Sequence, residues 1–152
     1  IDVSVGVTLE RFNKEVPGAS NFIKKAKGIL FFPSVIKVGI GIGGEYGEGA
    51  LLIGGKTADY HSSIAASIGF QFGAQAKSIV IAFLSGDTLT QFRHSDGWKA
   101  GVDGSVALIS LGMGDSQDTT NVKDPIVAFV FGQKGLMYNL TLEGSKFTKL
   151  KR

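Results

Sequence analysis

Val38-Gly39-Ile40-Gly41-Ile42-Gly43 is a stretch in which aliphatic residues and glycine alternate without a break. Successive side chains of a β-strand point to opposite faces, so this stretch predicts a strand with one Val/Ile face and one face of bare backbone. Glycine is unfavourable inside a strand unless another group approaches the backbone closely. We therefore expect a curved sheet that lets a helix, a ligand or another sheet come near, which indicates a binding module and not an enzyme.

The segments around this stretch predict an α+β fold and a single domain over residues 1–152. Amphipathic spacing indicates two N-terminal helices, over residues 8–16 and 20–27, and one short helix over 87–94. Strand patterns occur over residues 29–32, 35–46, 50–53, 56–60, 64–72, 76–84, 98–111 (a strand or hairpin), 126–131 and 136–142. Gly54-Gly55 is a two-residue hairpin signal. We expect a glycine-rich, strongly curved antiparallel sheet or partial barrel with the N-terminal helices packed on it and Trp98 in its core.

Composition excludes several classes of protein. The 152 residues include 22 glycines, 3 prolines and 43% apolar residues, which fits a β-rich globular fold and not disorder or collagen. Cysteine is absent, so disulfides and thiolate metal sites are excluded. Apolar runs such as 29–32, 79–84 and 126–131 are all far shorter than the roughly 20 residues of a membrane-spanning helix.

Motifs that resemble nucleotide or catalytic sites are better explained as structure. Gly39-Ile40-Gly41-Ile42-Gly43-Gly44 matches G-x-G-x-x-G, but it lies inside a predicted strand and no helix can follow it. His94-Ser95-Asp96 contains the residue types of a hydrolase triad, which must instead come together from separate segments. His61 with Ser62 would need remote partners. We therefore expect no catalytic residue.

Signals for metal and nucleic acid are equally weak. The two histidines lack helical i, i+4 spacing, and the oxygen-rich stretch 115–121 lacks the closing glutamate of a calcium loop. The net charge of +3 is small, and no recognition helix or aromatic platform accompanies it. We expect no metal, no cofactor and no nucleic-acid partner.

Basic residues gather near the N-terminus, where no Asp or Glu occurs between residues 16 and 44. They are Lys24, Lys25, Lys27 and Lys37. Lysines beside aromatic residues such as Phe31 and Phe32 are typical of a membrane interface, although lysines also simply solvate a helix that covers a sheet. Four lysines near an anionic leaflet contribute about 4 kcal/mol, a dissociation constant near millimolar. We therefore expect Phe31 and Phe32 to insert or to line a headgroup pocket.

Several motifs in the same order, covering nearly the whole chain, resemble the SYLF domain family. They are Ala26-Lys27-Gly28-Ile29-Leu30-Phe31-Phe32-Pro33, Gly43-Gly44-Glu45-Tyr46-Gly47-Glu48-Gly49-Ala50, Gly97-Trp98-Lys99-Ala100-Gly101-Val102-Asp103-Gly104 and Gly135-Leu136-Met137-Tyr138-Asn139-Leu140. The resemblance implies phospholipid binding. Eukaryotic members bind phosphoinositides and act on the actin cytoskeleton, whereas bacterial members consist of the domain alone, frequently as envelope lipoproteins. It also implies that the N-terminal helices with Lys24, Lys25 and Lys27 contact lipid.

The function expected from these observations is reversible, non-catalytic binding of anionic, phosphoinositide-like headgroups at a membrane surface. The expected location is the periplasmic face of a bacterial envelope membrane, as a lipoprotein whose signal and lipidated Cys precede this chain. Two alternatives stay open: a protein-interaction or scaffold module like the actin regulators, and a carrier of a whole lipid with acyl chains in the barrel. An enzyme that depends on His61 or His94 is the weakest alternative.

Overall fold

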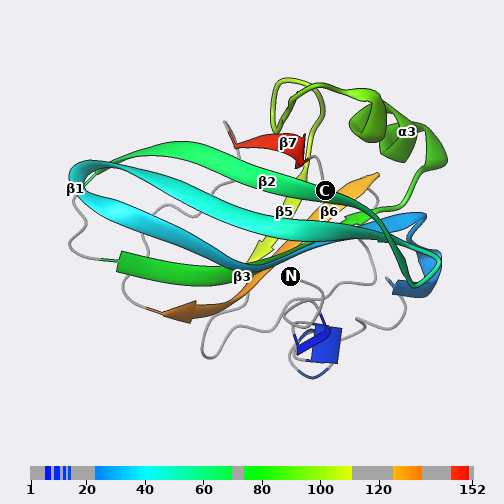
Figure 1. The fold of residues 1–152 in the computed structure, drawn as a ribbon, viewed down its shortest axis with the longest axis horizontal. Coiled ribbons are helices and arrows are strands. Elements are labelled where there is room, and N and C mark those ends of the chain that lie inside the picture. Colours follow the sequence, from blue (N-terminus) through cyan, green and yellow to red (C-terminus); the bar gives the residue numbers. More distant parts are fainter. Residues whose placement is uncertain are drawn as a thin grey trace.

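Seven strands form one sheet in the computed structural model, which describes residues 6–7, 9–10, 12, 14, 23–69, 74–110, 125–134 and 145–150 (Figure 1). Hydrogen-bonded neighbours follow the order β4-β7-β2-β1-β3-β6-β5. The elements are β1 (Gly28–Ile53), β2 (Lys56–Gly69), β3 (Ala74–Phe83), α3 (Gly86–His94), β4 (Trp98–Lys99), β5 (Ala107–Ser110), β6 (Ile126–Lys134) and β7 (Lys146–Leu150). Helical residues also occur ahead of β1, at 6–7, 9–10, 12, 14 and 23–25. The predicted α+β class is confirmed.

The long strand β1 folds back on itself, so it contributes two neighbouring arms to the sheet (Figure 1). Residues 28–38 pair with β3, and residues 41–53 pair with β2. The alternating Gly/aliphatic stretch over residues 38–43 lies where one arm passes into the other. A Cβ at Gly49 would overlap the carbonyl oxygen of Phe31, and one at Gly47 would lie 2.8 Å from Val35 Cγ2. The close neighbour at these glycines is thus the other arm of the same strand, and not a helix or a ligand.

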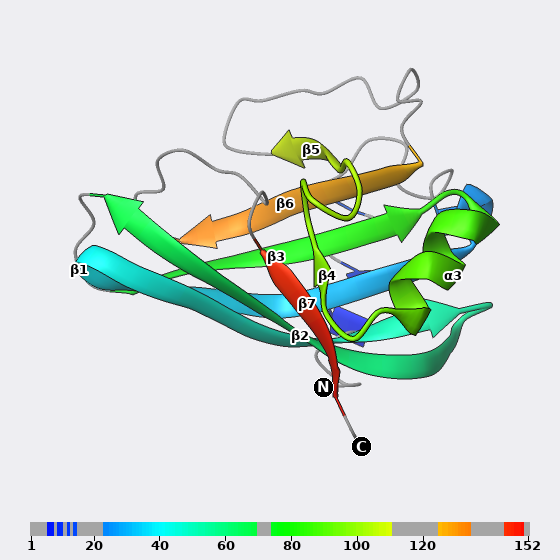
Figure 2. The same ribbon diagram turned by 90° about the horizontal axis from the view of Figure 1, so that it is seen from above.

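The sheet curls into a half-barrel (Figure 2). Gly54 and Gly55 connect β1 to β2 with φ values of 62° and 81°, which glycine tolerates and other residues rarely adopt, so the predicted hairpin turn is confirmed. Figures 1 and 2 both place α3 toward this end of the sheet, away from the tip where β1 folds back.

The sheet differs from the expectation in one pairing, because it is mixed and not wholly antiparallel. The segment predicted as a strand or hairpin over 98–111 forms two separate strands at opposite edges of the sheet. β4 pairs with β7, and β5 pairs in parallel with β6. Gly101, with φ 85°, reverses the chain after β4, and the chain then crosses to the far edge. The predicted strand over 136–142 and the oxygen-rich stretch 115–121 lie outside the described residues.

Both faces of the sheet carry a buried core, because strand side chains alternate and each face is covered. The α3-side core includes Leu89 and Phe92 of α3 together with Trp98 and Phe147 from the β4–β7 edge. The N-terminal-side core includes Phe12, whose ring meets that of Phe129 edge-on at 5.0 Å. Leu9, Ile23 and Ala26 pack against this second core.

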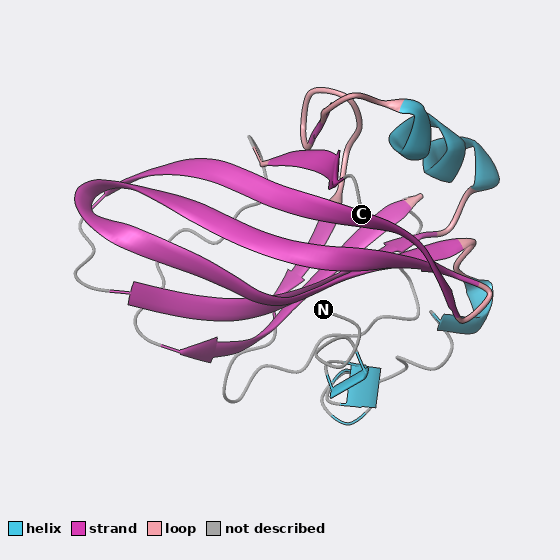
Figure 3. Cartoon of the chain, viewed as in Figure 1, coloured by secondary structure: helices cyan, strands magenta, loops and turns pink. Residues whose placement is uncertain are grey.

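These two cores confirm two predictions, that N-terminal helical segments pack on the sheet and that Trp98 is buried. Figure 3 shows the N-terminal helical residues on the side of the sheet opposite α3. Ser85 caps α3, and Leu89 and Phe92 face the sheet from it, as expected of the short helix over 87–94. Among the described helical residues, no segment has the length and apolar character needed to cross a bilayer.

We predict that Gly49→Ala lowers the free energy of unfolding by about 1–3 kcal/mol, because a methyl group there overlaps backbone that has no room to move. Gly44→Ala is the matched control, since its nearest neighbour would be Ala65 O at 3.6 Å. This control should stay within about 0.5 kcal/mol of wild type. Urea unfolding monitored by the fluorescence of Trp98 measures both. Equal losses in the two variants would contradict the contact between the arms of β1.

Candidate functional site

Three of the predicted lysines lie together on the outside of the segment that leads into β1. Lys24 and Lys25 are helical and exposed, and Lys27 is exposed immediately before β1. The intervening Ala26 and the preceding Ile23 are half-buried and pack on the N-terminal-side core. The backbone N–H of Lys27 donates to the carbonyl of Phe83 at 2.7 Å. The segment is thus fixed to the sheet by its apolar side chains and backbone, with its ammonium groups outward.

Lys37 does not belong to this group. Its backbone lies in β1, where it pairs with Gln75, and its side chain lies outside what the structure describes. Ten residues of extended strand separate it from Lys27, which corresponds to about 30 Å. The four lysines expected to attract one headgroup are therefore split, and the cluster consists of Lys24, Lys25 and Lys27.

The burial of Phe31 and Phe32 differs from the expectation that their rings contact lipid. Phe31 is 1% exposed in the N-terminal-side core, and Phe32 is 0% exposed in the α3-side core. Consecutive residues of a strand point to opposite faces, and both faces are covered here. Phe32 stacks on Phe147 with ring centroids 5.6 Å apart. Neither ring is placed to insert into a bilayer, so any apolar contact with lipid must come from other residues.

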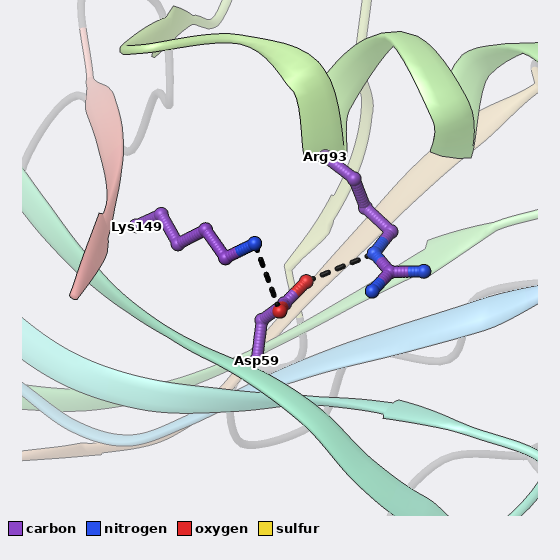
Figure 4. A network of polar contacts seen from close by, with 3 residues as sticks. All are labelled: Asp59, Arg93 and Lys149. Carbon is purple, nitrogen blue, oxygen red and sulfur yellow. Dashed lines mark hydrogen bonds and ion pairs between the residues drawn. The ribbon is translucent and has the colours of Figure 1, made fainter. Parts of the chain in front are cut away.

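The structure also contains a polar cluster that the sequence did not reveal, centred on Asp59 of β2 (Figure 4). Arg93 Nε of α3 donates to Asp59 Oδ2 at 2.9 Å, and Lys149 Nζ of β7 lies 3.1 Å from Asp59 Oδ1. One carboxylate of β2 therefore joins α3 to the sheet and adds an ion pair with the neighbouring strand β7. Burial raises the pKa of the Asp59 carboxyl, but hydrogen bonds and attraction from Arg93 and Lys149 outweigh it, so the pKa lies below its usual value.

His61 lies on the same face of β2 as Asp59 and is only 2% exposed. Its ring packs on Phe92 at 4.8 Å, and neither ring nitrogen has a hydrogen-bond partner in the described part of the chain. Burial lowers the pKa of His61 to about 4; the charge of Asp59 opposes this shift, and those of Lys149 and Arg93 add to it. The imidazole is thus neutral at pH 7, and packs as part of the core.

A second ion pair lies within the sheet and also serves the fold. Lys77 of β3 and Glu45 of β1 form an ion pair at 2.6 Å in which the side chains are 4% and 11% exposed. His94 is exposed at the end of α3. No group of three His, Cys, Asp or Glu side chains that could hold a metal occurs among the residues that the structure describes. The charged groups of this region thus form ion pairs that connect strands and α3 to one another.

One local signal in the sequence could have revealed part of this cluster. Asp59, His61 and Ser63 recur at every second position of β2, so they share one face, and all three are buried. A run of polar residues on an inward face predicts a buried network. Its partners on α3 and β7 are too distant in sequence to be assigned from that pattern.

We predict that the free energy of unfolding falls as the pH is lowered from 6.5 to 4. Because the folded-state pKa of His61 is depressed, the unfolded chain takes up a proton in this window before the folded chain does. One such group contributes a slope of at most about 1.4 kcal/mol per pH unit. His61→Phe, which keeps the ring contact with Phe92, should flatten this slope in urea titrations at a series of pH values.

His94→Gln is the control for this experiment, because His94 is exposed and its loss should leave the slope unchanged. The depressed pKa of Asp59 adds a further loss of stability when the pH falls below about 4, and this loss should persist in His61→Phe. A slope between pH 6.5 and 4 that is the same in wild type and His61→Phe would show that burial of the imidazole is not its cause.

Comparison with known proteins places these features in a family. The search of curated proteins found no match. The family model Ysc84, described as Las17-binding protein actin regulator, matches residues 64–152, which is more than half of the chain. The match includes part of β2 and all of β3, α3, β4, β5, β6 and β7, whereas Lys24, Lys25 and Lys27 precede it. The description names binding and regulation and no reaction. The chain belongs to the Ysc84 family, whose domain is the SYLF domain that the sequence motifs resemble.

Proposed function

We propose that this domain binds anionic phospholipid headgroups, of the phosphoinositide type, reversibly and without turnover at a membrane surface. The observation that supports the proposal is the grouping of Lys24, Lys25 and Lys27, three exposed lysines within four residues. Phosphate groups of a lipid headgroup carry the opposite charge, and several ammonium groups can approach one headgroup from such a segment.

The anchoring of this segment suits a surface role. Ile23 and Ala26 pack against the N-terminal-side core, and the Lys27 backbone is hydrogen-bonded to Phe83. The lysines are thus presented by a backbone that is already ordered next to β1, which limits the conformational entropy lost on binding. Lys77 and Lys149, by contrast, pair with carboxylates in the sheet and contribute to the fold.

The free energy that the three lysines contribute indicates how tightly this group can bind a membrane. Each lysine near an anionic leaflet contributes about 1 kcal/mol, so three contribute about 3 kcal/mol. A free energy of about 4 kcal/mol corresponds to a millimolar dissociation constant, so the lysines alone bind more weakly than that. Attraction of this size is reversible and strongly reduced by salt.

A protein-interaction module is the second candidate, and the family description favours it. The matched family is named for binding a protein and for regulating actin. The third expectation, a carrier that holds acyl chains against bare glycine backbone, has less support. Gly47 and Gly49 face the other arm of β1, and the cores on both faces are filled with side chains. A location at the periplasmic face of a bacterial envelope, as a lipoprotein, stays a prediction from the resemblance.

We predict that Lys24→Glu/Lys25→Glu lowers co-sedimentation with vesicles that contain phosphoinositide or another anionic lipid, by at least about tenfold in apparent affinity. Each substitution changes the charge by two units, so the double variant differs from wild type by four. Each unit of charge near an anionic leaflet contributes about 1 kcal/mol to binding. Wild-type binding should decline steeply as salt is raised from 0.05 to 0.5 M.

Single variants with a charge-matched control complete the design. Lys24→Glu and Lys25→Glu should each weaken binding, whereas Lys99→Glu, on the exposed edge at β4, should have little effect. Unchanged binding by the double variant would remove these lysines from the site. Equal binding of wild type to neutral and anionic vesicles would overturn the proposal and leave the protein-interaction module.

A further inference from the structure

Large apolar side chains that are exposed gather at one place on the sheet. The described residues with such side chains are Val7, Ile36, Tyr46, Ile64 and Val102. Tyr46 of β1 and Ile64 of β2 are direct cross-strand partners. A Cβ at Gly47 would lie 3.2 Å from Val35 Cα, so the two arms of β1 approach each other closely at these residues. Ile36 follows Val35 and Tyr46 precedes Gly47 in the sequence. The three exposed side chains therefore come from three adjacent strand segments, and we call them the Ile36–Tyr46–Ile64 row.

The Ile36–Tyr46–Ile64 row lies on the face of the sheet that carries the N-terminal-side core. Side chains two residues apart in a strand share a face, and Ala50 and Tyr60, on the same strands as Tyr46 and Ile64, belong to or pack against that core. Val35 lies in the α3-side core, so its neighbour Ile36 points to the other face. The N-terminal segment that carries the exposed lysines packs on this same face.

The exposure of this row is substantial and calls for an occupant. Ile36, Tyr46 and Ile64 are 46%, 49% and 50% exposed, whereas Phe31 on the same face is 1% exposed beneath the N-terminal cover. Adjacent exposed apolar side chains on a soluble surface mark sites of interaction. Three half-exposed side chains offer far less than the about 800 Å² per partner that a stable protein interface buries. A bilayer interface needs no such area, because lipid adapts its shape to the protein.

We infer that the Ile36–Tyr46–Ile64 row enters the interfacial layer of the same anionic membrane that the lysines attract. This inference rests on the proposed function and adds to it the apolar contact that the lysines lack. Tyrosine is favoured at the boundary between headgroups and acyl chains because its ring is apolar and its hydroxyl polar. The row thus takes the role expected of Phe31 and Phe32, whose rings are buried. The lysines attract the anionic membrane to this face, and apolar contact with the row stabilises the bound state.

The absence of cysteine from the chain makes a direct test possible, because one introduced cysteine can be labelled alone. Ile64→Cys and the control Val102→Cys are labelled with an environment-sensitive fluorophore such as NBD. Each is mixed with vesicles of phosphatidylcholine with 20–30% anionic lipid, roughly the composition that the charge argument requires. We expect a blue shift and increased emission at position 64 and none at position 102, which is exposed in the turn after β4.

A pair of substitutions tests the energetic contribution. Ile36→Ser/Ile64→Ser should weaken vesicle binding by between about tenfold and a hundredfold, and should do so at high salt as well as low, because apolar contact is not screened. Val102→Ser should have no effect. Since both isoleucines are half-exposed, circular dichroism and urea unfolding should show that the double variant is folded.

The possible results separate this inference from the proposed function. Anionic vesicle binding without a shift at position 64, or unchanged binding of Ile36→Ser/Ile64→Ser, would overturn the row as a membrane contact and leave the lysines as the site. If the wild-type protein does not bind anionic vesicles, both the proposed function and this inference are overturned. A change in oligomeric state of the double variant by light scattering, with vesicle binding intact, would assign the row to a second copy of the chain and also overturn the inference.

Discussion

The contact between the two arms of β1 sets the geometry on which the other features depend. At Gly49 the backbone of one arm lies where any side chain would overlap the Phe31 carbonyl of the other. This approach joins β2 to one side of the doubled strand and β3 to the other, so β1 lies at the centre of the sheet. Because β2 and β3 hold the two arms in fixed register, the direction of each side chain along them is fixed as well. A change at the glycines would therefore alter the packing of both cores at once.

Alternation along these arms determines which residues are available to a ligand. Phe31 and Phe32 enter the two cores, while Ile36 and Tyr46 stay half-exposed. The aromatic rings that the sequence places beside the lysines are therefore part of the fold. In the membrane contact inferred above, Ile36, Tyr46 and Ile64 would supply the apolar contact in their place. The face on which each of these side chains lies follows from the register of its strand.

Local pattern was enough to predict the features that depend on neighbours in sequence. The Gly54-Gly55 turn, the short helix with Leu89 and Phe92 inward, and the burial of Trp98 all follow from spacing within a few residues. What failed depends on distant segments. Nothing near β5 indicates that its partner is parallel, and nothing near Asp59 names Arg93 or Lys149. The grouping of Lys24, Lys25 and Lys27 is visible in the sequence because it is local, whereas ten residues of strand separate the backbone of Lys37 from that of Lys27.

Charge and apolar contact have different ranges, so in the proposed membrane binding the lysines and the row would have distinct roles. Attraction between Lys24, Lys25 and Lys27 and an anionic bilayer would extend over about one Debye length, roughly 8 Å in physiological salt, and would therefore orient the protein before contact. Burial of Ile36 and Ile64 acts only at contact and is not weakened by salt. A surface with lysines alone would be captured and released too readily to stay at a membrane. A surface with the row alone would bind without regard to headgroup, so discrimination between membranes requires that both lie on one side of the sheet.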